Sequence, residues 1–149
     1  MVPQTLPVTP MEPLPLAEPF QDAAFRYEVK WDGIRTIVGY DNGRVRLWLR
    51  KGGDITRHFP ELHYPLTYAQ RAVLDGELIV LDTSRRPNFA RVVRRLRLKN
   101  PAGIHHARQT SPAILMAFDL LQLEGEDLRP LPWWRRKELL QQTLHVSQH

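Results

Sequence analysis

From residue 25 to residue 31 the chain alternates strictly between apolar and polar side chains. Successive side chains of a strand point to opposite faces, so this period of two predicts a β-strand whose polar face carries Arg26, Glu28 and Lys30. The sequence "DGIR" interrupts the strand and "TIVGY" continues it. The turn signal "DNG" then leads into a second alternating stretch, residues 44–50, and "KGGD" provides another turn. Residues 25–50 are therefore predicted to form an antiparallel meander.

Two longer apolar runs predict buried strands. The run "AVLDGELIVLD", residues 72–82, is nearly continuous, which is typical of a central strand covered on both faces. The run "AILMAFDLLQLEG", residues 113–125, has the same character and ends in a turn.

Two other segments suit helices. Residues 89–98 place apolar side chains on one helical face and a row of arginines on the other. Pro132 suits the first turn of a last helix, which is predicted from Trp133 to about Leu144. Residues 60–69 are predicted as loop or short helix, and residues 99–112 as loop. Together these elements predict an α+β domain of antiparallel sheets with flanking helices.

The first twenty residues differ in composition from the rest, since they hold six of the thirteen prolines. They are predicted to form an extended leader that lies across the domain or is partly disordered, so residues 1–20 and 21–149 are treated as separate units. The chain has no cysteine, no apolar run of the roughly 18 residues that a membrane span requires, and no secretory signal pattern. We therefore expect a cytoplasmic protein without a membrane partner.

The formal net charge is +5, and only four of the twenty-one basic residues are lysines. Arginine pairs bidentately with phosphate, so this bias favours an anionic polymer such as nucleic acid. An arginine-rich composition can equally reflect a GC-rich genome or a warm habitat. If DNA is the partner, the arginine face of the helix predicted at 89–98 provides the candidate contacts Arg91, Arg94, Arg95 and Arg97.

Lys30 is the first candidate for chemistry, because a glycine and Arg35 follow it closely. The glycine allows a sharp turn, and Arg35 could hold a phosphate while the lysine attacks it. A lysine nucleophile must lose its proton, which nearby positive charge and partial burial favour. The alternative is a surface lysine paired with Glu28, and for a lone strand lysine this is the more common situation.

Glu77 and Phe118 stand out within the two apolar runs. An acid in such a run must be hydrogen-bonded, paired or bound to a metal, so Glu77 is either a site residue or the partner of an arginine. Phe118 is either a core aromatic or a ring that stacks on a base. Arg50, beside a glycine turn, either contacts phosphate or ends a solvated hairpin. The six histidines lack zinc-type spacing and are predicted not to be ligands.

Four segments in this order resemble motifs of the covalent nucleotidyltransferase superfamily, which contains ATP-dependent DNA ligases, RNA ligases and mRNA capping enzymes. "EVKWDGIR" resembles the motif of the lysine nucleophile, and "LRKGGDIT" with "FPEL" resembles the arginine motif after the first hairpin. "DGELIVLD" resembles the acidic-strand motif, and "MAFDLLQLEGEDLRPLPWWRRKELL" the aromatic-strand motif with its helix. The likeness covers roughly residues 15–145 and is marked for the ligase domain of bacterial non-homologous end-joining enzymes, which also carry a segment like "RRPNFARVVRRL".

This resemblance implies an ATP-grasp-like adenylation domain and a role for each matching residue. Lys30 would attack the α-phosphate of ATP to form lysyl-AMP, Glu28 would help select adenine, and Phe118 would stack on it. Arg35 and Arg50 would contact the ribose, the phosphates or a DNA end. Glu77 would bind the ribose hydroxyl, with a metal-ligand role left open. The implied cofactors are ATP with Mg²⁺ or Mn²⁺, and the implied partner is DNA with 5′-phosphate ends, joined in end joining or nick sealing.

The sequence departs from the family after the aromatic-strand helix. The later glutamate-glycine and lysine-x-lysine motifs and the OB-fold domain are not found in it. Because loss of one electrostatic contributor typically costs on the order of 10²–10³ in rate, little or no ligation is expected from this chain alone. It could be half of a split ligase, a nucleotide- or DNA-binding remnant, or a fragment of a longer enzyme. Exposed sheet edges then predict a homodimer or a second chain that supplies the remaining motifs.

Overall fold

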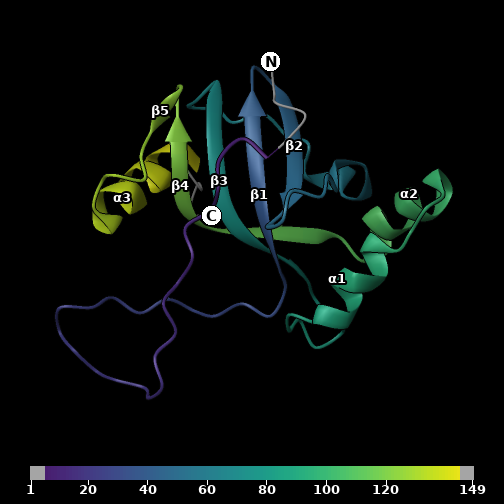
Figure 1. Cartoon of the computed structure of the whole chain (residues 1–149). Helices are drawn as coiled ribbons and strands as arrows, with labels where there is room; N and C mark the ends of the chain where they lie inside the picture. Colours follow the sequence, from purple (N-terminus) through teal and green to yellow (C-terminus); the bar gives the residue numbers. More distant parts are fainter. Residues whose placement is uncertain (1–5, 145–149) are drawn as a thin grey trace.

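The core of the protein is one five-stranded antiparallel sheet in the order β2-β1-β3-β4-β5 (Figure 1). The structure is a computed structural model, and it describes residues 6–144. The strands are β1 (Ile34–Asp41), β2 (Arg44–Leu49), β3 (Arg71–Val80), β4 (Ala113–Leu123) and β5 (Glu126–Asp127). The predicted α+β class is therefore confirmed, with a single sheet where several were expected.

Three α-helices accompany the sheet: α1 (Phe89–Leu96), α2 (Pro101–Thr110) and α3 (Trp133–Leu144). Two short 3₁₀-helices, η1 (Thr56–His58) and η2 (Pro60–Leu62), lie between β2 and β3. In Figure 1, α3 lies beside β4 and β5, whereas α1 and α2 lie on the right of the view, away from α3. Within the described range, no helix combines the length and apolar character needed to cross a membrane.

The hairpin between β1 and β2 is formed as the turn signal predicts. Asp41 pairs with Arg44, which leaves Asn42 and Gly43 as a two-residue loop. Both loop residues have positive φ, 50° and 81°, the combination that matches the twist of two antiparallel strands.

The strand β3 is central and is covered on both faces, as its apolar run predicts. On one face, Leu74 and Leu78 belong to a cluster that includes Val92 of α1 and Leu140 of α3. On the other face, a smaller cluster is covered by the leader, whose Leu6, Val8 and Met11 pack against it. The buried members of this smaller cluster are Ile37, Trp48, Val73 and Leu121.

The strand predicted at residues 25–31 is absent, and this prediction was wrong. No described strand pairs with this segment, so its backbone has no ladder to join. Its apolar side chains are exposed: Phe25 at 53%, Tyr27 at 61% and Val29 at 67%. Figure 1 shows the segment extending away from the sheet before β1 begins. The meander therefore consists of β1 and β2 alone.

The loop predicted at residues 99–112 is the helix α2. Two features stabilise the start of this helix. The Asn100 side chain accepts a hydrogen bond from the Gly103 N–H, and Pro101 occupies the first turn. His105 and His106 therefore lie on a helix. Among residues 6–144, no group of three or more potential ligands could hold a metal ion.

Arg95 does not lie on an exposed arginine face, which corrects the sequence expectation for this residue. It is 2% exposed and forms two hydrogen bonds to the Glu61 carboxylate, at 2.7 and 3.1 Å. It also donates to the His58 and Ser111 carbonyls. Burial alone would raise the pKa of Glu61, but Arg95 and the Ala113 N–H outweigh it and lower that pKa. Arg95 thus ties α1 to η1, η2 and the end of α2.

Replacing Arg95 with leucine should destabilise the protein by about 3–5 kcal/mol, because the half-buried Glu61 carboxylate and several carbonyls lose their donor. Urea unfolding followed by circular dichroism measures the change. Arg94→Leu on the same helix is the matched control, since Arg94 is exposed and its loss should cost within about 0.5 kcal/mol. Equal effects of the two substitutions would contradict the role assigned to Arg95.

Candidate nucleotide-binding site

Gly33 brings the lysine segment against the central strand. A Cβ atom built on Gly33 would lie 2.3 Å from the Leu78 carbonyl oxygen, closer than any side chain tolerates. Its role is therefore close approach to β3, rather than the special turn conformation expected from sequence. Directly after it, Ile34 pairs with Leu78 and Arg35 pairs with Glu77.

The Arg35 guanidinium binds a neighbour of Glu77 rather than Glu77 itself. Its Nε and Nη2 donate to the two Asp75 carboxylate oxygens at 3.0 and 2.7 Å, and Asp75 is 1% exposed. The hydrogen bond to Asp75 is the main cause that raises the pKa of Arg35. Burial raises the pKa of Asp75 even though Arg35 opposes this shift. Arg35 is thus fixed by a bidentate contact in the sheet.

Glu77 has no ion-pair partner among the described residues, so the salt bridge considered from sequence is not formed. Burial is the main cause that raises its pKa. The charges of Lys30 and Arg35 and the Gly33 N–H act in the opposite direction. The Lys30 ammonium is thus one of the charges that act on the Glu77 carboxyl.

Lys30 itself is exposed and forms no hydrogen bond or ion pair with any of residues 6–144. The alternative of a Lys30–Glu28 pair is excluded, because Glu28 instead forms an ion pair with Lys137 of α3. Lys137 also donates to the Phe118 carbonyl at 2.6 Å. One lysine of α3 thereby joins the segment before β1 to the middle of β4.

Phe118 lies at an irregularity in β4. The pairing passes from Asp75↔Asp119 to Gly76↔Ala117, so Phe118 is an extra residue on its strand. Such a bulge changes the direction of a side chain relative to the sheet. The Phe118 ring is half-buried, and the Arg35 Cζ atom lies 5.9 Å from its centroid. This places an aromatic ring and a cation side by side.

Arg50 is connected to the site through the leader. Glu12 lies between the two arginines, with its carboxylate oxygens 3.7 Å from Arg35 Nη1 and 3.2 Å from Arg50 Nε. The Met11 carbonyl accepts a further bond from Arg35 Nη2 at 2.6 Å. Arg35 and Arg50 are therefore joined by a single carboxylate.

The structure thus connects six of the residues selected from sequence: Lys30, Arg35 and Glu77 directly, Phe118 through Arg35, Glu28 through Lys137, and Arg50 through Glu12. Sequence reasoning missed Glu12 and Lys137 as neighbours of the site. No sequence signal indicates either contact, because each depends on how a distant segment packs.

The described residues supply little of a metal site. Asp75 is engaged by Arg35, so Glu77 is the carboxylate left for a cation, and no three-ligand group exists within residues 6–144. Mg²⁺ commonly uses one or two carboxylates and completes its shell with water and substrate phosphates. The residues present would therefore fit a divalent metal whose ligands came largely from a bound nucleotide, and Glu77 would be a protein ligand for it.

Comparison with known proteins identifies the family of this chain. Residues 13–149 match the family model described as the ATP dependent DNA ligase domain. The chain is 33% identical over 144 residues to the "Bifunctional non-homologous end joining protein LigD" of Bacillus subtilis, covering 92% of this chain and 24% of that protein. It is 39% identical over 122 residues to "DNA ligase C2" of Mycolicibacterium smegmatis, covering 79% of this chain and 33% of that protein.

A solved structure shows the same fold. The structure of "mycobacterial DNA ligase D complexed with ATP and MES" superposes with a TM-score of 0.60 at 34% identity, covering 77% of this chain and 35% of that one. The fold and the site thus define an adenylation domain of the ligase type. The chain belongs to the ATP-dependent DNA ligase domain family and resembles bacterial end-joining ligases. It spans about a quarter to a third of the relatives named here.

Substituting Lys30 with methionine should raise the pKa of Glu77 further, because the positive charge that partly opposes burial is removed. Titration of the Glu77 carboxyl carbon by NMR measures this shift. Lys51→Met removes a lysine that is not among the charges acting on Glu77, and it should leave the Glu77 pKa unchanged. An unchanged pKa in Lys30→Met would show that the two side chains do not face each other in solution.

Proposed function

We propose that this chain carries the adenylation chemistry of a DNA ligase, with Lys30 as the nucleophile. The neutral Lys30 amine would attack the α-phosphorus of ATP, forming an N–P bond as the bond to the β-phosphate oxygen breaks and pyrophosphate leaves. The observation that best supports this role is the position of Lys30: exposed, without an ion-pair partner among the described residues, and electrostatically coupled to Glu77. A nucleophile must be accessible and near groups that orient the substrate.

The surrounding residues suit the parts of the nucleotide. The Phe118 ring can stack on adenine, and Glu28, held by Lys137, can accept a hydrogen bond from its amino group. Glu77 can bind a ribose hydroxyl directly or through water. Arg35 and Arg50 can contact the phosphates or a DNA end once Glu12 is displaced. A divalent cation, when bound, would neutralise charge on the phosphate oxygens.

The later steps follow from the family. Lysyl-AMP would transfer AMP to a DNA 5′-phosphate, and a 3′-hydroxyl would then displace AMP to seal the nick or join the ends. These steps need groups that hold both DNA and metal, and the described residues supply one free carboxylate for the latter. We therefore expect adenylation to be detectable and ligation by the isolated chain to be weak or absent. A cytoplasmic location is part of this proposal.

Incubation with ATP labelled at the α-phosphate and Mg²⁺ or Mn²⁺ should label the protein covalently, and Lys30→Ala should abolish the label. The phosphoramidate should be stable to alkali and labile to acid. Lys51→Ala is the matched control and should retain the label. Absence of label in the unmodified chain, or a label that survives Lys30→Ala, would sink the catalytic proposal for this chain.

A second candidate function is binding without chemistry, as a nucleotide- or DNA-binding subunit in repair. The contacts of Arg35 support it, since this residue is held by Asp75 and by the leader rather than free for a phosphate. Under this alternative, ATP would bind without covalent labelling. Equilibrium dialysis with labelled ATP distinguishes the two, because binding that persists in Lys30→Ala without any label favours the subunit role.

We further propose that a second copy or a partner chain covers the segment before β1. The alternating side chains Phe25, Tyr27 and Val29 are all exposed, and Trp134 of α3 is exposed at 63%. A cavity lined by Phe25, Trp133 and Trp134 joins these surfaces. A strand-like segment without a paired neighbour invites backbone pairing with another chain.

Light scattering should therefore report dimers of the isolated chain at high concentration, and Phe25→Lys should shift it toward monomer, since Phe25 lines this cavity. The added charge opposes burial of this face. Tyr68→Lys is the control, since Tyr68 is also exposed but does not line this cavity. A monodisperse monomer at high concentration would exclude the homodimer and leave a different chain as the partner to seek.

A further inference from the structure

The positive charge of the protein is concentrated in one segment. Residues 83–118 contain eight lysines and arginines and no acidic residue, whereas the rest of the chain has more acidic residues than basic ones. This segment contains α1 and α2. The net charge of +5 is therefore a local property of these two helices and their flanks, not an even excess over the surface.

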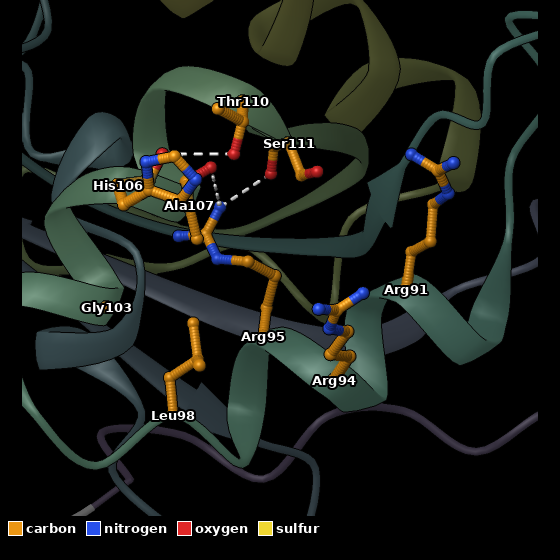
Figure 2. A pocket seen from close by; sticks show the side chains of 9 residues that line it. All are labelled: Arg91, Arg94, Arg95, Leu98, Gly103, His106, Ala107, Thr110 and Ser111. Carbon is orange, nitrogen blue, oxygen red and sulfur yellow. Dashed lines mark hydrogen bonds between the residues drawn. The ribbon is translucent and has the colours of Figure 1, made fainter.

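A cavity of about 420 Å³ lies between α1 and α2 (Figure 2). Its lining on the α1 side consists of Arg91, Arg94 and Arg95 of the helix and Leu98, the second residue after its end. Gly103, His106, Ala107, Thr110 and Ser111 line it from α2 and its C-cap. Cavities of this size accept small ligand groups, and the charged lining here selects for an anion.

Arg95 fixes the walls of the cavity. Its Nη1 donates to the Ala107 and Ser111 carbonyls at 3.3 and 2.7 Å, so it holds the end of α2 against α1. Figure 2 shows its guanidinium directed at these two carbonyls. Glu61 neutralises its charge. Arg95 therefore shapes the cavity without being available for a ligand.

Three other polar groups of the cavity remain available, whereas Arg91 donates to the Leu81 carbonyl at 3.3 Å. Arg94 is exposed and has no hydrogen-bond or ion-pair partner within residues 6–144. The Ser111 hydroxyl and the His106 ring likewise have no partner in that range, whereas the Thr110 hydroxyl already donates to the His106 carbonyl. An arginine, a hydroxyl and an imidazole around one cavity suit the oxygens of a phosphate.

We propose that this cavity binds an internucleotide phosphate of duplex DNA. The inference rests on DNA as the partner in the proposed function but does not require Lys30 to react. The charge outside the cavity favours a polymer over a free phosphate, because Arg97, Lys99 and Arg108 are exposed on the same segment without an ion-pair partner among the described residues. A single small anion would need none of these.

The position of the cavity agrees with a duplex that reaches the candidate site. The Asn88 N–H donates to the Val80 carbonyl at 2.9 Å, so α1 begins where β3 ends. At that same end of the sheet, Ile34 begins β1 and pairs with Leu78, four residues after Lys30. A backbone held between α1 and α2 would therefore lie near the end of the sheet at which β1 begins, after the segment that carries Lys30.

Fluorescence anisotropy of a labelled, nicked DNA duplex measures this contact in the full chain between about 50 and 200 mM salt. Arg94→Gln should weaken binding several-fold at low salt and reduce the slope of log K against log salt by about 1, the value for one phosphate contact. Ser111→Ala should weaken binding less, with little change in slope. Arg44→Gln removes an equally exposed arginine at the β1–β2 hairpin and should leave the slope unchanged.

Equal losses in Arg94→Gln and Arg44→Gln would overturn the proposal, since only net charge would then matter. So would unchanged binding in Arg94→Gln, or no binding of duplex DNA at low salt. Tighter binding of a duplex RNA, with the same dependence on Arg94, would overturn DNA as the partner. Lys30→Ala should leave the slope intact, so failure of this site and failure of adenylation are separate results. Urea unfolding of each variant verifies that the fold is retained.

Discussion

The buried contact between Arg35 and Asp75 is the interaction on which the candidate site depends. A charge on each of two adjacent strands is removed from water, and only the bidentate geometry makes this tolerable. Arg35 pairs with Glu77 in the strand register, but its guanidinium binds Asp75 instead. The Glu77 carboxylate is therefore left without this arginine as its partner. It also holds Arg35 beside Phe118 and presents Nη2 to the leader. The apolar clusters stabilise the fold, whereas this polar contact determines which charged side chains of the candidate site have a partner within the sheet.

Arginine serves two distinct purposes in this protein, and the helix α1 contains both. Arg95 is buried, neutralised and used as a structural cross-link, whereas Arg94, its neighbour in sequence, is exposed and has no ion-pair partner within residues 6–144. The same contrast separates Arg35, which Asp75 and the leader hold, from Arg50, which forms an exposed ion pair with Glu12. Surface ion pairs of this kind contribute about 0–1 kcal/mol, so they leave an arginine available to another anion.

Sequence periodicity predicted β1, β2, β3, β4, α1 and α3, because these elements bury one face or two. It failed for residues 25–31, whose alternation is as regular as that of β2 but which lack a neighbouring strand. It also missed α2, whose helical signal lies in the Asn100-Pro101 start rather than in a strong apolar face. The motif residues were found by resemblance, whereas the contacts of Glu12, Lys137 and Arg95 arise from tertiary packing that no local pattern encodes.

The position of Glu12 between Arg35 and Arg50 means that the leader and any shared anionic ligand are linked equilibria. A phosphate that engages both arginines must release this carboxylate, and by reciprocity a docked leader must weaken that phosphate. The carboxylate and Arg50 are both about half exposed, so the opposition is small in free energy. The leader would then act as a weak internal competitor. A ligand with several negative charges would displace it easily, whereas a ligand with few negative charges would bind more weakly because of it.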